Sequence, residues 1–159
     1  MHTETKIFIE ADPMTVYRYA AATERWPEFL PHYRWVYVLD REGDSKLVEM
    51  AAKRNFYLFN WPVRWWAAQT NIDDEPRIKF THVGGITKGM EVEWLFEPKD
   101  NGVEVTIVHD LELKWPLIGG FAANWVVGPV FVDAIAGKTL ECVKEMAESH
   151  ETAPVGASS

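Results

Sequence analysis

Alternation of polar and apolar residues predicts that most of this chain forms β-strands. In residues 3–11, Thr5, Ile7 and Ile9 fall on one face, which is the period of two that a half-buried strand requires. The alternation is clearest where Met90 and Trp94 share a face opposite glutamates. The same criterion predicts further strands at residues 33–42, 46–59, 63–72, 77–83, 90–98 and 103–113.

Helical spacing replaces this alternation in two regions. Asp12 is predicted to cap a short helix whose first residue is Pro13, and a second short helix follows over residues 27–33. Apolar residues then recur every three or four positions from about residue 120 to residue 148, which predicts a long helix kinked near Pro129. Residues 149–159 are polar with proline and glycine, so we expect a disordered tail.

The order of these elements predicts an α+β fold. One strand, two short helices, about six antiparallel strands and one long helix segregate by type instead of alternating. A twisted sheet of six to seven strands can curve around the long helix, which touches only part of the concave face. We therefore predict a single domain over residues 1–148 with an internal space between helix and sheet.

Composition narrows the range of partners. The net charge of −8 argues against a nucleic acid or an anionic membrane surface as partner, because either would need a basic face. The chain has one cysteine, Cys142, and its first residues lack the apolar run of a signal peptide. No stretch approaches the ~20 apolar residues of a membrane span. These features predict a cytoplasmic protein, as a monomer or a homodimer.

Residues 55–66, NFYLFNWPVRWW, carry six aromatic rings on both strand parities. A half-buried strand hides only every second side chain, so either both faces are covered or one face lines an internal space. Residues 60–62 are interpreted as a corner between two strands. Of the neighbours Trp65 and Trp66 only one can point inward, and we expect Trp66, with Thr70, because that parity continues to Ile72. Simple core filling is the alternative.

Polar residues on apolar faces are the candidate functional groups. His109 shares its parity with valines, isoleucine and leucines, so the strand points an imidazole inward. A histidine titrates near neutral pH and suits acid/base chemistry on a ketone or enol, although a hydrogen-bonded core histidine has the same pattern. His82 shares the parity of Ile78 and Phe80 but lies at a strand end, where solvation at the rim is an alternative to ligand contact.

Arg54, Asp133 and Arg64 are the charged candidates. Arg54 has inward parity and needs a partner, since an unpaired buried charge costs several kcal/mol. Asp133 interrupts an apolar run of the long helix and could face the cavity, either toward a ligand or in a structural pair with Arg54. Arg64 follows Pro62 and is expected at the mouth. Trp94 and Trp125 lie on apolar faces where they would contact a ligand.

Motifs for phosphate, dinucleotide or metal binding are absent from the sequence. Gly84 and Gly85 precede Ile86 and Thr87 and are interpreted as a plain loop. We therefore expect no cofactor and no metal.

Three segments carry a resemblance to a known family. Residues 8–33 (FIEADPMTVYRYAAATERWPEFLPHY), the REGDS hairpin and the ending AGKTLECVKEMAE are similar to the START-like helix-grip superfamily, in its polyketide cyclase/dehydrase and lipid-transport branch. The resemblance covers about residues 3–148 and implies a helix-grip fold with a deep cavity for hydrophobic or aromatic molecules. It places Tyr33 where aromatase/cyclase members have a cavity tyrosine, and Thr70 where they have an arginine.

Three functions are compatible with these features. In the first, a cyclase- or dehydratase-like enzyme uses His109, Tyr33 and Arg54 on a polyketide-like carbonyl substrate held by Arg64, Trp66, Thr70, His82, Trp94, Trp125 and Asp133. In the second, the cavity is a carrier site for a lipid, isoprenoid or quinone, and the polar groups only satisfy the polar end of the ligand. A non-catalytic partner of another protein is a third interpretation.

Overall fold

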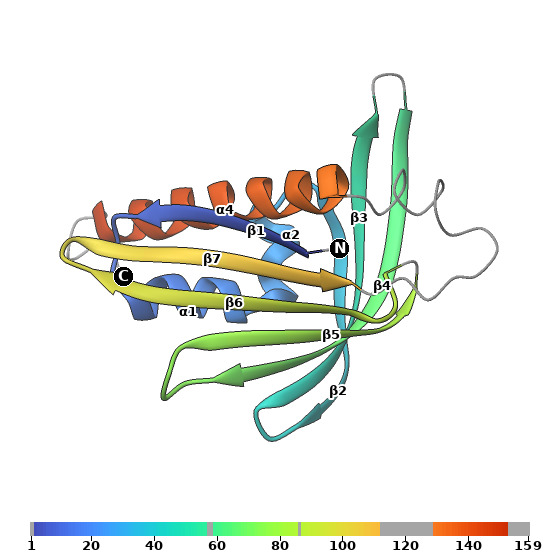
Figure 1. Ribbon diagram of the computed structural model, residues 1–159, viewed down its shortest axis with the longest axis horizontal. Coiled ribbons are helices and arrows are strands. Elements are labelled where there is room, and N and C mark those ends of the chain that lie inside the picture. The colour runs from blue at the N-terminus through green and yellow to red at the C-terminus, as the bar shows by residue number, and fades with distance from the viewer. Residues whose placement is uncertain (1, 57–58, 86, 112–128, 153–159) are drawn as a thin grey trace, which may run out of the picture.

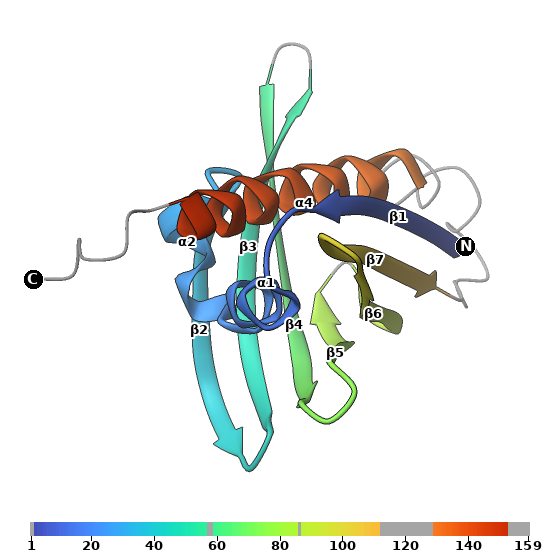
Figure 2. The same cartoon turned by 90° about the vertical axis from the view of Figure 1, so that its left-hand side faces the viewer.

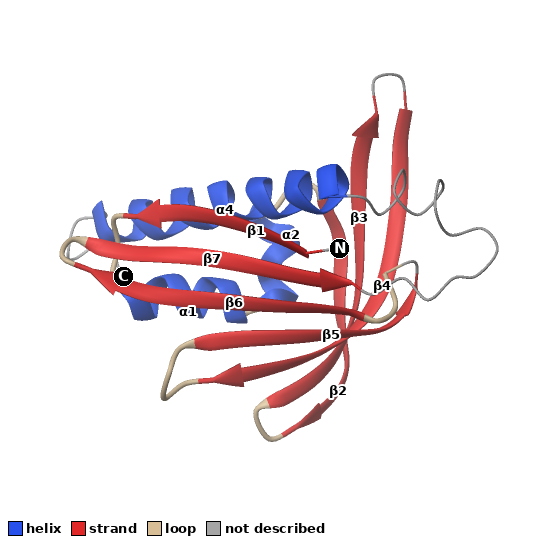
Figure 3. Cartoon of the chain, viewed as in Figure 1, coloured by secondary structure: helices blue, strands red, loops and turns tan. Residues whose placement is uncertain are grey.

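The computed structural model describes residues 2–56, 59–85, 87–111 and 129–152, and the side chains of all of these except 54–56, 59–61 and 129–131. Its centre is a seven-stranded antiparallel sheet in the order β1-β7-β6-β5-β4-β3-β2 (Figures 1 and 3). The strands are β1 (His2–Ile9), β2 (Tyr33–Glu42), β3 (Ser45–Phe56), β4 (Phe59–Ile72), β5 (Arg77–Gly85), β6 (Met90–Lys99) and β7 (Gly102–Leu111).

The helices are α1 (Pro13–Ala21), η1 (Thr23–Arg25), α2 (Trp26–Phe29) and α4 (Pro129–Thr152). Asp12 caps α1 as the sequence predicts, because its carboxylate accepts hydrogen bonds from the backbone N–H groups of Met14 and Thr15. The expected fold, a curved antiparallel sheet with a long C-terminal helix, is confirmed.

The sheet curves around α1 and α4, which lie together in its concave side (Figure 2). Strand alternation buries one side chain in two against these helices. On α4 the buried face consists of Val132, Ala136, Thr139, Leu140, Val143 and Ala147. This is the three-and-four spacing expected for the long helix.

Several sequence-based boundaries differ from the structure. The second short helix ends at Phe29 instead of residue 33, and β3 ends at Phe56 instead of residue 59. Residues 60–62 are not a corner, because β4 runs through them and pairs Arg54 with Trp61 and Lys53 with Pro62. Strand β5 pairs with β4 only from Trp65 onward. Among the described residues, Pro62 therefore has a strand partner on one side only, and a proline is tolerated at such an edge. Helix α4 continues to Thr152, so residues 149–152 are helical and not part of a tail. The helix predicted for residues 120–128, including its kink, lies outside the described residues.

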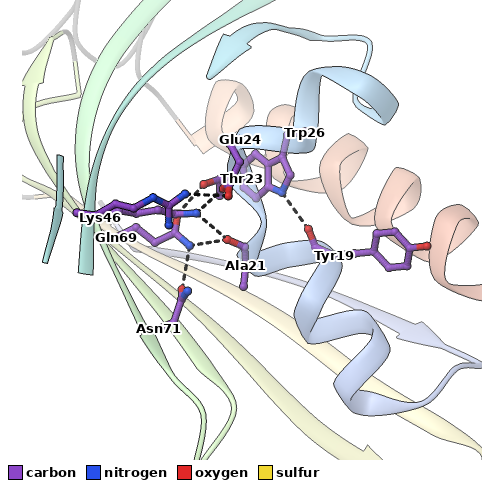
Figure 4. A network of polar contacts seen from close by, with 9 residues as sticks. Tyr19, Ala21, Thr23, Glu24, Trp26, Lys46, Gln69 and Asn71 are labelled. Atoms are coloured by element: carbon purple, nitrogen blue, oxygen red, sulfur yellow. Dashed lines mark hydrogen bonds and ion pairs between the residues drawn. The ribbon is translucent and has the colours of Figure 1, made fainter. Parts of the chain in front are cut away.

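A buried polar network anchors the end of α1 to the sheet (Figure 4). Gln69 on β4 is fully buried; its Nε2 donates to the Ala21 carbonyl and to Asn71 Oδ1, both at 2.9 Å, and its Oε1 accepts from Thr23 Oγ1 at 2.7 Å. Lys46 Nζ donates to the same Ala21 carbonyl and pairs with Glu24 at 2.5 Å. Every polar atom of the Gln69 side chain is therefore matched, and this satisfied network fixes where α1 ends over the sheet.

Replacing Gln69 by leucine should destabilise the fold. The change leaves the Thr23 hydroxyl buried without its acceptor and removes one donor from the Ala21 carbonyl, at about 1–3 kcal/mol for an unsatisfied buried group. Urea unfolding followed by circular dichroism measures the free energy of unfolding. The matched control is Thr81→Val, which removes an exposed hydrogen bond to Glu91 and should stay within about 0.5 kcal/mol. Equal effects of the two substitutions would contradict the role given to the network.

Candidate functional site

A cavity lies between the concave face of the sheet and α4, with a volume of about 70 Å³. A space of this size holds about five water molecules and is about half the volume of a cavity that binds benzene, roughly 150 Å³. Its walls include aromatic residues from five different elements: Trp26 of α2, Tyr33 of β2, Trp65 of β4, Phe80 of β5 and Trp94 of β6. Val132, Ile135 and Ala136 of α4 close the other side. The arrangement suits a flat apolar group.

His109 of β7 lines this cavity with only 8% of the residue exposed. Its Nδ1 is buried and has no hydrogen-bond partner among the described residues. The residue directly opposite it on β1, Thr3, is also buried, and its Oγ1 is equally unpartnered within the described residues. An unpaired buried polar atom costs about 1–3 kcal/mol. Of the two residues, only His109 is among those that line the cavity.

His82 of β5 also lines the cavity and is buried, so it is not a solvated rim residue. Its Nδ1 lies 2.6 Å from the hydroxyl of Thr87, another residue of the cavity wall. Its ring stacks on Trp65 with 5.9 Å between ring centroids and 9° between planes. His82 is thus held in one orientation by a hydrogen bond and a stacking contact.

Tyr33 and Thr139 supply polar groups on another part of the wall. Thr139 Oγ1 donates to the Ile135 carbonyl at 2.8 Å and lies 2.9 Å from Nε2 of the buried His32. Since the single Thr139 proton is used on Ile135, His32 donates from Nε2 and its Nδ1 carries no proton. The His32 ring meets Tyr33 edge-on with 4.8 Å between centroids. His32 therefore supports Tyr33 and Thr139 from behind the cavity wall.

Burial keeps the titratable groups of the site neutral. It lowers the pKa of His109 to about 4, with Asp133 and Asp110 acting in the opposite direction. Burial also lowers the pKa of His82 to about 3 and that of His32 to about 4. The expectation that His109 titrates near neutral pH is therefore wrong, because desolvation of the imidazolium outweighs the nearby carboxylates. Burial raises the pKa of the Tyr33 phenol, which stays protonated.

The inward tryptophan of β4 is Trp65 and not Trp66. Trp65 is buried in the cavity wall, whereas Trp66 is half-buried on the opposite face, where its Nε1 donates to Glu49 at 3.2 Å. Thr70 shares the Trp66 parity and lies beside the Ser45 hydroxyl. The expectation that Trp66 points inward failed because the buried face of β4 includes the polar residue Gln69. The hydrogen bonds of Gln69 at the end of α1 offset the cost of burying its side chain.

Arg64 and Asp133 also point away from the cavity. Arg64 is exposed, stacks over Trp66 with Cζ 4.4 Å from the ring centroid, and pairs with Glu49 at 3.4 Å. Asp133 is exposed and accepts a hydrogen bond from Thr5 Oγ1 at 3.3 Å. Because successive helical residues are turned by about 100°, the burial of Val132 directs Asp133 to the solvent side of α4.

The remaining predictions divide into two groups. Trp94 lies in the cavity wall, as do Tyr33, His82 and His109, so the fold brings these four predicted residues together. The Arg54 side chain and Trp125 lie outside the described part of the chain.

Sequence reasoning missed His32, Thr87 and Thr139. Only Thr139 left a signal, as a hydroxyl on the apolar face of a helix. Thr87 follows two glycines in a loop, and His32 lies between a short helix and a strand, where periodicity has no meaning.

Within the described residues, no group of three or more histidine, cysteine, aspartate or glutamate side chains is arranged to hold a metal ion. No helix among those residues has both the length and the apolar character that crossing a membrane requires. The described lining residues are all uncharged when the histidines are neutral.

Comparison with known proteins agrees with the fold. TTHA0849 from Thermus thermophilus superposes with a TM-score of 0.80 at 23% identity, over 96% of this chain and all of that chain (100%). The Zhui aromatase/cyclase from Streptomyces sp. R1128 superposes with a TM-score of 0.83 at 16% identity, over 96% of both chains. A START superfamily protein from Mycobacterium smegmatis gives a TM-score of 0.64 at 18% identity, over 94% of this chain and 95% of that chain. These identities establish the fold and not the reaction.

A search of curated proteins gave no match. The sequence model of one family, described as polyketide cyclase/dehydrase and lipid transport, matches residues 9–130, which is most of the chain. That match agrees with the fold and with the aromatic cavity between sheet and helix. The chain therefore belongs to the polyketide cyclase/dehydrase and lipid transport family.

Proposed function

We propose that this protein binds a neutral, hydrophobic aromatic or polyketide-like molecule in the cavity and acts on it as a cyclase- or dehydratase-like enzyme. The observation that carries the proposal is His109, a neutral imidazole buried in an aromatic wall with an Nδ1 that has no partner among the described residues. A buried polar atom without a partner is uncommon in a folded protein and calls for an explanation. A ligand hydroxyl, enol or carbonyl at this position supplies one.

The lack of charge in the described lining restricts the ligand. A carboxylate or phosphate transferred into this cavity would lose its hydration without meeting a cation from those residues, which costs far more than moving a neutral oxygen. The aromatic walls favour a flat ring. The cavity volume of about 70 Å³ is small for a whole ligand, so a larger molecule would insert only one end.

Tyr33 and His109 would supply the chemistry as an uncharged acid and an uncharged base. Imidazole Nδ1 accepts a proton from the carbon next to a ketone, and the resulting enolate carbon forms a C–C bond to a second carbonyl of the same chain. The Tyr33 phenol donates a hydrogen bond, and then its proton, to the alkoxide oxygen that this attack creates. Proton transfer from the imidazolium back to the phenolate restores both groups. The cavity walls hold the two reacting carbons together, which supplies much of the acceleration.

A carrier function is the second candidate, and one observation favours it. With a pKa of about 4, His109 is a weaker base than one matched to neutral pH, and general-base efficiency falls with that mismatch. In a carrier, His109 and Tyr33 would only form hydrogen bonds to the polar end of a bound quinone or isoprenoid. Binding and turnover therefore have to be measured separately.

Ligand binding is tested by the adjacent pair Trp65 and Trp66. Titration with 2-naphthol, followed by fluorescence, should show that Trp65→Ala weakens binding by about tenfold or more, because an aromatic wall is lost. Trp66→Ala removes the same side chain from the opposite face of the strand and should leave the affinity nearly unchanged. Equal affinities of both variants and the wild type would show that the ring does not enter this cavity.

Catalysis is tested by His109→Gln, which keeps a hydrogen-bonding group but removes proton transfer. Turnover of a poly-β-ketone substrate, followed by product absorbance, should fall by about 10²–10⁴ while 2-naphthol affinity changes by less than about tenfold. The control is His2→Gln at the exposed start of β1, which should leave the rate unchanged. A wild-type rate in the His109 variant would eliminate the enzyme proposal and leave the carrier.

The neutral histidines predict how stability depends on pH. The pKa values of His32, His82 and His109 are lowered in the folded state, so between about pH 6.5 and 4 the unfolded chain binds more protons and acid favours unfolding. The free energy of unfolding should fall through this range by up to about 1.4 kcal/mol per pH unit for each histidine. Urea unfolding at pH 7, 6 and 5 measures the slope.

The histidine variants check the origin of that slope. His109→Gln should make it shallower by up to one proton. His2→Gln should not, because the hydrogen bond to Asp110 raises the pKa of His2, and a raised pKa in the folded state makes a contribution of the opposite sign to the slope. A stability that is flat between pH 7 and 5 would contradict the neutral interior.

A further inference from the structure

A second cleft lies on the other side of α1, between α1, the η1–α2 segment and the last turns of α4. Its volume is about 480 Å³, within the range of ligand sites in proteins, roughly 300–1,000 Å³. Sequence reasoning assigned nothing to this region, and the proposed function does not use it.

The floor of the cleft is mainly apolar, and its rings contact one another. Tyr19 meets Phe29 edge-on with 5.8 Å between centroids and meets His150 edge-on at 6.2 Å. Ala22 and Met146 extend this surface. The floor offers a place for an apolar group of one or two rings.

The rim of the cleft is basic although the whole chain carries a net charge of −8. Arg18 and Arg25 both line it, and Arg18 has no ion-pair partner among the described residues. Glu28 is the acidic residue of the described lining, and its Oε2 already accepts from Nε and Nη2 of Arg25 at 3.2 and 3.1 Å. Arg25 Nη1 and the whole Arg18 guanidinium therefore remain available as donors to an anion.

The acidic residues at the end of α4 do not neutralise this rim. Glu151 accepts a hydrogen bond from the Asp12 backbone at 3.1 Å, and Glu148 accepts one from the Glu10 backbone at 3.0 Å and pairs with Lys144. Both carboxylates are thus committed to fastening α4 to the chain around the start of α1. None of Glu145, Glu148 and Glu151 is among the described lining residues, which include two arginines and one glutamate.

Helix α2 contributes to both spaces, with Trp26 in the lining of the inner cavity and Phe29 in that of the cleft. Trp26 lines the inner cavity, while its Nε1 donates to the backbone carbonyl of Tyr19 at 3.2 Å. The Tyr19 ring extends away from the buried network and toward α4 (Figure 4). The two spaces therefore differ in lining: the inner one is uncharged and aromatic, and the outer one is cationic over an aromatic floor.

From this contrast we propose that the outer cleft is a second ligand site, which binds a small amphipathic anion: an aromatic or aliphatic group that carries one carboxylate or phosphate. The apolar part lies on Tyr19, Phe29 and Met146, and the anionic group meets Arg18 and Arg25. Arginine suits this role because its planar guanidinium donates two parallel hydrogen bonds to a carboxylate or phosphate. Neutral molecules enter the inner cavity instead.

The test titrates the full chain with 1-naphthyl phosphate, 1-naphthoate and 2-naphthol while backbone amide signals are followed by NMR. Both anions should shift the amides of α1, α2 and the last turns of α4, and 2-naphthol should shift those of the inner cavity. Tighter binding of one anion identifies the preferred head group. Raising the salt concentration should weaken the anions and not the naphthol.

Variants of Arg18 separate a cationic site from a merely apolar surface. Arg18→Gln should weaken 1-naphthyl phosphate by about threefold and Arg18→Glu by about tenfold or more, as expected for an exposed charge contact. The matched controls are Arg77→Gln and Arg77→Glu on β5, which make the same charge changes outside the cleft and should have no effect. Unchanged spectra confirm the fold of each variant.

Three results would overturn the proposal. They are the absence of amide shifts at the cleft with either anion at millimolar concentration, equal binding of 2-naphthol there, and affinities that the Arg18 variants do not change. None of them depends on ligand binding in the inner cavity, which 2-naphthol reports separately.

Discussion

The concave face of a seven-stranded sheet is wider than the helices that lie in it, and this geometric mismatch shapes the whole molecule. Strand alternation sends every second side chain toward α1 and α4, yet α4 covers only part of that surface. Large aromatic residues from five elements fill most of the remaining volume and leave a cavity of about 70 Å³. The cavity is therefore a consequence of the architecture, and its chemistry depends on the few polar residues in its wall.

Desolvation determines what those polar residues can do. Where a buried polar group finds partners, as Gln69 does, it stabilises the position of a helix end. Where it finds none among the described residues, as with Nδ1 of His109 and Oγ1 of Thr3, the cost stays in the folded state and a ligand can remove it. The same desolvation holds His109, His82 and Tyr33 in their neutral forms. The described lining of the interior is therefore uncharged.

Helix α1 contacts both the sheet and helix α4. Its C-terminal end is fixed to the sheet through Ala21, whose carbonyl accepts from both Lys46 and Gln69. Its outer side forms the basic cleft with the end of α4, while the neighbouring Trp26 closes the inner cavity. The two spaces differ in the charge of their described linings: the inner one is uncharged, and the outer one has two arginines and one glutamate.

The sequence by itself determined the fold class, the number and order of the strands, the capping of α1 by Asp12 and the inward direction of His109. These depend on local periodicity and on residues next to one another in the chain, which physical chemistry connects directly to backbone geometry.

The tertiary structure decided the rest of the site. Alternation shows that only one of Trp65 and Trp66 faces inward. Which of the two does so depended on whether Gln69, which has the same parity as Trp65, would find hydrogen-bond partners. Those partners are Thr23 and Ala21, which lie 46 and 48 residues away in sequence. The pKa of His109 likewise depends on burial by strands and a helix that are distant in sequence. The free energy of a charged group is set by its three-dimensional surroundings and not by its neighbours along the chain.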